Sequence, residues 1–213
     1  MAYDFVAASS QRIESNATFA ALSYPVTLSC WMRPDLTGTI RYAFSLSHAT
    51  LVSALSLGQD ASNYIVAEEN RGAVTGTSQA SATLTTGTWY QVVGVFNSAS
   101  ARTVYVDGTA GTANTTAVTA GTYGRPTIGV RNRNLAFTSY FDGKVGECAV
   151  WNVALNDDEI MSLARGFRAS LIRTRSLRYY APLAGNTNDV RDNVAATSTN
   201  GPTADALHPR RYG

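Results

Sequence analysis

The feature that most constrains the fold is a strand followed by a turn and a capped helix at Tyr140–Gly166. Its first part alternates apolar residues, as a β-strand does. Asn156 or Asp157 can cap the helix that follows, Glu159 completes a capping box, and Gly166 stands where a helix ends. Because the rest of the chain has the pattern of strands and turns, the sequence predicts one helix of about two to three turns in an all-β protein.

Short strand-like runs separated by turn residues fill the rest of the chain. Alternate residues from Val26 to Met32 share one apolar face, and Asp107-Gly108 is a hairpin turn between Arg102–Val106 and Thr109–Val118. The other expected strands are Arg41–Leu46, Leu51–Leu57, Tyr64–Glu68, Trp89–Phe96, Pro126–Val130, Tyr140–Val150 and Leu177–Ala181. So many short period-2 runs predict two packed antiparallel sheets.

Composition narrows the class of protein. A chain of 213 residues fits one all-β domain, and a net charge of +2 argues against a nucleic-acid partner. Cys30 and Cys148 are expected as buried free thiols, with a disulfide left open if their strands are adjacent. We find no signal peptide and no apolar stretch long enough to span a membrane, so we expect synthesis in the cytoplasm and no membrane partner.

Four motifs in the same order carry a resemblance to a known family. VTLSCWMRP at Val26–Pro34, TGTWYQVVGVFN at Thr86–Asn97, YVDG at Tyr105–Gly108 and the strand-turn-helix at Tyr140–Gly166 resemble laminin-G-like domains of the concanavalin A-like lectin/glucanase superfamily. The resemblance implies an antiparallel two-sheet jelly-roll sandwich. It also implies carbohydrate binding as the common activity of the family.

The order of segments departs from that family. Ser176–Thr203 resembles the segment that usually opens these domains, and Ala2–Ser15 resembles the part that follows it. We interpret the chain as circularly permuted, which sandwich folds tolerate because their termini are often close. The expected division is a main sandwich at 1–166, an Arg-rich connector at 167–178 and a C-terminal segment at 179–213. That segment either completes the same sandwich or docks on a neighbouring subunit.

Catalytic patterns are missing from the sequence. None of its 15 acidic residues forms the paired-carboxylate motif of glycoside hydrolases on this fold, and only Glu147 and Asp142 could face a groove. His48 and His208 stand in no nucleophile motif. The sequence therefore predicts a protein that is not an enzyme.

Three sets of residues are candidates for binding. A glycan rim of aromatic, amide and guanidinium groups is expected from one loop region: Tyr123, Arg131, Asn132, Arg133, Asn134, Phe137 and Tyr140. A segment with five arginines and no acidic residue is a candidate docking surface for phosphate or an acidic protein: Arg165, Arg168, Arg173, Arg175 and Arg178. The alternative is an ordinary folded connector. No cofactor is expected apart from calcium, whose candidate ligands are Asp142, Asp189 and Asp192, with a turn-forming role as the alternative.

The primary functional hypothesis is a non-enzymatic phage virion protein with a lectin-like recognition domain. It rests on a general similarity to laminin-G-like proteins encoded in phage genomes and on the missing export signal. Such a protein would decorate a capsid, form head fibres or belong to the tail. Its expected partners are the major capsid protein, a host-surface glycan and further copies of itself, for example in a trimer. The alternatives are a stand-alone carbohydrate-binding module and, less favoured, a glycoside hydrolase.

Overall fold

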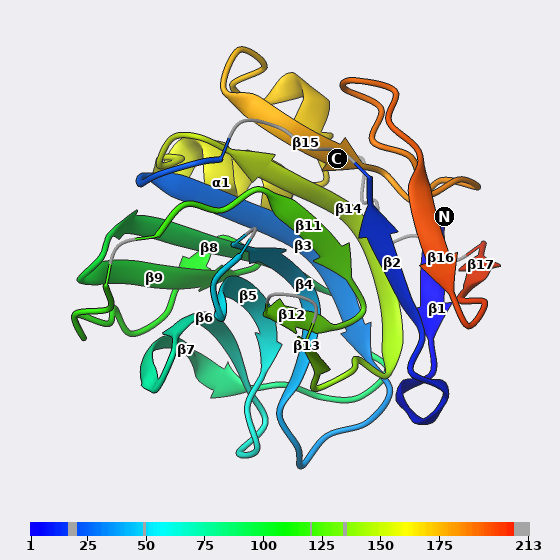
Figure 1. The fold of residues 1–213 in the computed structure, drawn as a ribbon, viewed down its shortest axis with the longest axis horizontal. Helices are drawn as coiled ribbons and strands as arrows, with labels where there is room; N and C mark the ends of the chain where they lie inside the picture. The colour runs from blue at the N-terminus through cyan, green and yellow to red at the C-terminus, as the bar shows by residue number, and fades with distance from the viewer. Residues whose placement is uncertain (17–20, 49, 120, 134–135, 207–213) are drawn as a thin grey trace.

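Two antiparallel β-sheets stacked face to face form the molecule (Figure 1). The computed structural model describes residues 1–16, 21–48, 50–119, 121–133 and 136–206. One α-helix and two single turns of 3-10 helix, Ala7–Ser9 and Ala169–Leu171, occur in these ranges. The predicted all-β jelly-roll sandwich with one short helix is confirmed.

The 8-stranded sheet contains the strands at both ends of the chain. Its order is β10 (Thr109–Ala110), β9 (Ala101–Val106), β8 (Tyr90–Ser98), β3 (Val26–Pro34), β14 (Gly143–Trp151), β1 (Ala2–Phe5) and β17 (Thr203–Asp205). The eighth strand, β15 (Leu177–Ala181), pairs with the second half of β14, beyond the part that pairs with β1. One edge of β14 is therefore shared by two strands from distant parts of the chain.

The 7-stranded sheet forms the other layer. Its order is β16 (Ala196–Thr199), β2 (Arg12–Ser15), β11 (Arg125–Ile128), β4 (Arg41–Ser47), β5 (Ser53–Gln59), β6 (Tyr64–Arg71) and β7 (Val74–Thr83). A separate hairpin of β12 (Arg131–Arg133) and β13 (Ala136–Thr138) follows β11. This hairpin contacts β4, β5 and β11 of the sheet.

The main core lies between the sheets. The alternating residues Val26, Leu28, Cys30 and Met32 of β3 are all fully buried there, so the predicted apolar face is confirmed. Burying such side chains contributes about 1.5–3 kcal/mol each relative to exposure. Cys148 on the neighbouring strand β14 is also buried, and both cysteines are free thiols.

An ion pair lies among the buried residues. Arg102 Nη2 on β9 is 3.1 Å from Glu69 Oε2 on β6, and both side chains are fully buried. Arg102 also donates to the carbonyl oxygens of Thr116 and Ala99, which supplies the hydrogen bonds that a buried charge requires. On β7, a Cβ at Gly76 would lie 1.8 Å from Arg102 Nη1, so a residue without a side chain stands there.

The helix α1 (Asp157–Ala164) begins and ends where the sequence predicts. Asn156 Oδ1 accepts from the Glu159 backbone N–H at 3.0 Å, and Glu159 Oε2 accepts from the Asn156 N–H at 2.9 Å. Gly166 has φ +89°, the left-handed conformation in which a helix often ends. None of the described helices combines the length and apolar content required to cross a membrane.

The C-terminal segment lies beside the N-terminal strands in this structure. Figure 1 shows β16 next to β2 and β17 next to β1, and both pairings are antiparallel. Thr197 is paired with Glu14 in one sheet, and Ala204 with Tyr3 in the other. Residues after β14 thus add strands to both layers, whereas the proposed circular permutation stays a prediction.

Two strand predictions differ from the structure. The strand expected at Thr109–Val118 ends at Ala110, and isolated bridges at Thr112 and Asn114 take over the pairing. The sequence also gave no signal for β7, which has ten residues. The positions of β7 that pack inward are Gly76, Ser78 and Ala80, and such small residues carry little apolar periodicity. At Gly76 the side chain of Arg102 fills the space that a larger residue would need.

Candidate functional site

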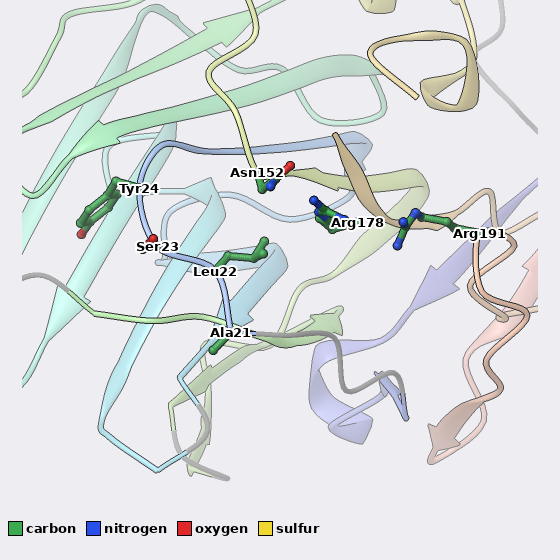
Figure 2. Close-up of a pocket in the computed structure, with 7 residues that line it drawn as sticks. All are labelled: Ala21, Leu22, Ser23, Tyr24, Asn152, Arg178 and Arg191. Atoms are coloured by element: carbon green, nitrogen blue, oxygen red, sulfur yellow. The ribbon is translucent and has the colours of Figure 1, made fainter. Parts of the chain in front are cut away.

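A polar pocket opens where three chain segments meet at one end of the 8-stranded sheet. Trp151, the last residue of β14, is paired with Thr27 on β3 and with Leu177 on β15. The segment before β3, the residue after β14 and the first residues of β15 therefore come together. We call the cavity of about 500 Å³ the Arg178 pocket; it is lined by Ala21, Leu22, Ser23, Tyr24, Asn152, Arg178 and Arg191 (Figure 2).

A β-bulge directs Arg178 at this pocket. Val150 is paired with Tyr179, but the next residue of β14, Trp151, is paired with Leu177, so Arg178 has no partner on the ladder. Tyr179 belongs to the core between the sheets, and Leu177 belongs to the cluster under α1. The extra residue of a bulge leaves the regular alternation of a strand, and bulges often redirect a side chain beside a functional site. Arg178 is half-buried and lines the pocket.

Asp189 holds the turn that carries the second arginine. Its Oδ1 accepts the backbone N–H of Arg191 and that of Tyr180 on β15, both at 3.0 Å. The Asp189 side chain is fully buried. The turn is thereby fixed to the strand that carries Arg178, and Figure 2 shows the Arg191 side chain extending toward Arg178.

The apolar side of the pocket comes from Leu22 and Tyr24. Leu22 is bridged to Tyr123 by two backbone hydrogen bonds of 2.7 and 2.9 Å. The Tyr24 ring packs edge-on against the Tyr123 ring at 6.4 Å, and its hydroxyl donates to Glu69. Burial, reinforced by the hydrogen bond to Glu69, raises the pKa of Tyr24 well above its usual range, so the phenol stays neutral. The Tyr24 ring is thus fixed and uncharged, and in Figure 2 it extends away from Arg178.

The polar side of the pocket is rich in nitrogen donors. Asn152 contributes its amide, whose Oδ1 is buried without a hydrogen-bond partner among the described residues. Arg178 and Arg191 contribute guanidinium groups, and the seven lining residues include no Asp or Glu. The pocket therefore combines a positive wall with an apolar one, and its volume lies in the range of small-molecule sites.

Two residues of the expected glycan rim are buried. Tyr123 is fully buried, and its hydroxyl donates to Glu69 Oε1 at 2.7 Å. Asn132 is 2% exposed, with its backbone N–H on Ser45 Oγ and its Nδ2 on Thr127 Oγ1. Both side chains are enclosed because Tyr123 packs into the core and β12 folds onto the sheet, and their role in glycan binding stays a prediction.

The arginines of the expected rim bind the sheet below them. Arg131 Nη1 lies 2.7 Å from Glu68 Oε1, and its guanidinium is 4.7 Å from the centroid of the Tyr42 ring. Arg133 Nη1 donates to Asn70 Oδ1 at 2.8 Å. These contacts attach the β12–β13 hairpin to the outer face of the 7-stranded sheet.

The remaining rim residues lie apart from one another. Phe137 lies under the guanidinium of Arg12, 4.0 Å from its ring centroid. Tyr140 lines a different cavity, of about 390 Å³, together with Asp142. Asn134 lies outside the described residues. A role for Phe137 or Tyr140 in binding stays a prediction.

The arginines of the connector occupy different settings. Arg178 belongs to the pocket, and Arg173 makes an ion pair with Glu159 of α1. Arg165, Arg168 and Arg175 are exposed, and their side chains make no ion pair or hydrogen bond with other described residues. Two large apolar side chains of the same segment are also exposed, Phe167 at 55% and Leu171 at 66%.

The candidate calcium ligands serve local structure. Besides Asp189, Asp142 Oδ2 accepts the Ala7 N–H at 3.0 Å, and Asp192 Oδ2 lies 3.0 Å from Arg191 Nη1. Within the described ranges, no group of three or more His, Cys, Asp or Glu side chains could hold a metal ion. Calcium binding stays a prediction.

The carboxylate that could have suggested catalysis is enclosed. Glu147 is 6% exposed and accepts a hydrogen bond from the Tyr180 hydroxyl. It stands with φ +53° where the register between β14 and β3 shifts. Asp142, the second acid that could face a groove, lines the cavity of about 390 Å³ and accepts the Ala7 N–H. Neither residue lines the Arg178 pocket.

Fold and site together define a lectin-like jelly roll of the concanavalin A type. A model of the concanavalin A-like lectin/glucanases superfamily matches residues 6–161, and the chain belongs to this family. The family expected from the sequence motifs is thus confirmed. No curated protein sequence matches the chain.

Solved structures share the fold at low sequence identity. A heptameric SAP-like pentraxin from Limulus polyphemus has a TM-score of 0.67 and 15% identity, over 91% of this chain and 87% of that chain. A candidate carbohydrate binding protein from Bacteroides ovatus has a TM-score of 0.70 and 17% identity, over all of this chain and 61% of that one. A sialidase CBM40 domain from Ruminococcus gnavus, bound to α2,3-sialyllactose, has a TM-score of 0.54 and 12% identity, over 71% and 97%.

Proposed function

We propose that this domain is a non-catalytic carbohydrate-binding module whose ligand occupies the Arg178 pocket. The observation that carries the proposal is the pairing of two walls: Leu22 and Tyr24 on one side, and the donors of Asn152, Arg178 and Arg191 on the other. A sugar ring presents apolar C–H faces and polar hydroxyl edges, and such a pocket can contact both.

Family membership and the structural neighbours support the proposal. The Bacteroides ovatus neighbour, described as a carbohydrate-binding protein, matches the full length of this chain. The Ruminococcus gnavus neighbour was solved with a bound sialyl sugar. The alternative of a glycoside hydrolase is less favoured, because no carboxylate lines the pocket and Glu147 is enclosed.

A glycan array with a blocked variant tests the proposal. Ser23 is exposed and lines the pocket, so Ser23→Trp would fill it with an indole ring. Ser62→Trp, in the exposed turn between β5 and β6, is the matched control. We expect the native chain and the control to bind the same glycans and Ser23→Trp to lose them. Binding by neither the native chain nor the control would contradict the function, and equal binding by both variants would contradict the site.

A second candidate function is docking on an acidic particle surface, as expected for a phage virion protein. The specific observation in its favour is the exposed Phe167 and Leu171 beside the three unpaired arginines of the connector. Co-sedimentation with assembled phage particles tests this docking function. The triple variant Arg165→Glu, Arg168→Glu and Arg175→Glu should stay in the supernatant while the native chain pellets. Failure of the native chain to pellet would sink the virion hypothesis.

Self-association belongs to the same hypothesis. The pentraxin neighbour is a heptamer, whereas a trimer was expected for this chain. Light scattering after size-exclusion chromatography measures the mass directly, and a mass equal to one chain of 22.7 kDa would contradict an oligomer.

A further inference from the structure

The Arg178 pocket holds positive charge that the protein does not balance. Arg178 makes no ion pair or hydrogen bond with any described residue, although its side chain is half-buried. A guanidinium withdrawn from water normally gains a carboxylate or several hydrogen bonds in exchange. Arg173 on the same connector is more exposed, yet it is paired with Glu159. The unpaired state of Arg178 therefore distinguishes it from the arginine that only fastens the connector.

A second guanidinium shares the same space. Arg191 lines the pocket with Arg178, and its carboxylate partner is the adjacent Asp192, at 3.0 Å in an exposed pair. Exposed ion pairs contribute little to stability, so Asp192 holds Arg191 only weakly. Two like charges directed into one cavity repel each other unless an anion lies between them. Asp189 fixes the turn that carries Arg191 to β15, the strand that carries Arg178. The two arginines are thereby kept at the same pocket.

The geometry points to a ligand with its own negative charge: we propose that the Arg178 pocket recognises the carboxylate of an acidic sugar. This inference rests on the proposed carbohydrate-binding function and names the class of sugar. Planar guanidinium groups bind a carboxylate through two parallel hydrogen bonds, and the amide of Asn152 adds a neutral polar contact. Leu22 and Tyr24 would contact the uncharged face of the ring.

The apolar wall favours an anion carried on a sugar over inorganic sulfate or phosphate. An inorganic or terminal tetrahedral anion would use the arginines and leave Leu22 and the Tyr24 ring without a partner, whereas a carboxylated sugar engages both walls. Sulfated and phosphorylated sugars are therefore useful competitors in the test.

Calorimetric titration of matched ligands tests the charge requirement. The ligands are 3′-sialyllactose, its methyl ester and lactose, followed by a glucuronate-containing disaccharide and its neutral glucose counterpart. We expect at least one free acid to bind about tenfold or more tightly than its neutral counterpart, since a hydrogen bond to a charged group is worth more than a neutral one. The methyl ester should bind like the neutral sugar.

Variants of the two arginines locate the effect. Arg178→Gln and Arg191→Gln should each weaken the acidic ligand by about tenfold to a hundredfold and weaken neutral sugars by less, because a neutral sugar loses no charge-assisted hydrogen bond. Arg178→Lys should retain part of the affinity, because lysine keeps the positive charge but lacks the paired N–H donors of a guanidinium. Arg175→Gln is the control: it removes one exposed connector arginine and should change nothing. Circular dichroism of each variant checks folding.

The outcomes separate the two proposals. Equal binding of free acid, ester and neutral sugar would overturn the acidic-sugar inference and leave the carbohydrate-binding function standing. Tighter binding of sulfated or phosphorylated sugars, or full affinity in Arg178→Gln, would also overturn it. If neither charged nor neutral sugars bind, the proposed function fails together with the inference.

Discussion

The two sheets are covered on their outer faces by opposite kinds of chemistry. Over the 8-stranded sheet, α1 and the connector bury an apolar cluster that includes Trp151, Ile160 and Leu163. Over the 7-stranded sheet, the β12–β13 hairpin rests on polar contacts, chiefly Arg131 with Glu68 and Arg133 with Asn70. Both covers occupy a sheet face, but one excludes water by apolar area and the other by paired polar groups.

The difference teaches where the stability of the molecule resides. Apolar burial contributes in proportion to area, whereas a buried polar pair must first recover the cost of removing two charged groups from water. The apolar cover is therefore expected to dominate the free energy of unfolding. The polar cover is expected to fix geometry with a smaller net contribution, although loss of one partner is costly.

The largest expected effect comes from breaking the apolar cover. Trp151 is fully buried, and its Nε1 donates to the Ile172 carbonyl oxygen at 2.8 Å. Trp151→Ala should lower the free energy of unfolding by about 3–5 kcal/mol in chemical denaturation. Leu171→Ala, which alters an exposed residue of the same cover, should cost less than about 0.5 kcal/mol. Similar losses for both variants would contradict the assignment of stability to the buried cluster.

Breaking the polar cover should cost less. Arg131→Met leaves the nearly buried Glu68 carboxylate without its cation and should cost about 1–3 kcal/mol. The double variant with Glu68→Gln should recover much of that loss, because the stranded charge is gone. Denaturation of the two single variants and the double variant gives the coupling energy. Strictly additive losses would show that the pair contributes nothing.

A smaller effect is expected at the start of α1. Asn156→Ala removes the oxygen that caps the Glu159 N–H and should cost about 1 kcal/mol. Asn156→Asp keeps an acceptor there and also suits the positive end of the helix dipole, so its stability should stay near that of the native chain. Thermal unfolding followed by circular dichroism distinguishes the two. Equal destabilisation would mean that the cap is not what the side chain contributes.

The smallest expected effect is on the pH dependence of stability, through His48 just after β4. Burial, and then the nearby charges of Arg71 and Arg125, lower the pKa of His48, whose Nδ1 accepts the N–H groups of Thr50 and Leu51. A lowered pKa means that the unfolded chain binds the proton more readily. This stabilisation is present above the unfolded pKa of about 6.5 and is lost as the pH falls through the folded pKa.

His48→Asn tests this contribution. Its side-chain oxygen can accept the same N–H groups without titrating. The stability of the variant should change less between pH 8 and pH 5 than that of the native chain, as measured by denaturation across that range. An identical pH dependence would show that His48 does not contribute.

The sequence predicted the elements whose residues interact with near neighbours in the chain or follow a simple apolar alternation. The capping box of Asn156 and Glu159 and the alternating face of β3 both appear as expected. The sequence could not indicate β7, whose inner residues are small, and at Gly76 the side chain of Arg102, far along the chain, occupies the space. The sequence predicts an open loop where the structure has the β12–β13 hairpin. Local pattern does not show the hairpin's contacts, because the partners of its arginines lie on β6.

The pocket was harder to predict than the fold. Arg178 was singled out only as part of a basic run, and Tyr24, Asn152 and Arg191 were not singled out at all. These residues come from separate segments that meet only after β3, β14 and β15 have paired. The bulge that redirects Arg178 depends on the register between two strands, which single-sequence periodicity does not encode.

The pairing of β1 with β17 has a consequence for how the chain is made. Tyr3 lies opposite Ala204, so β1 acquires its outer neighbour only after a strand far along the chain has been made. Until then β1 and β2 are unpaired edges that invite contact with another nascent chain. Both sheets therefore gain these neighbours only after the segment beyond β15 has been made, and slow translation of that segment would lengthen the exposure of the two edges.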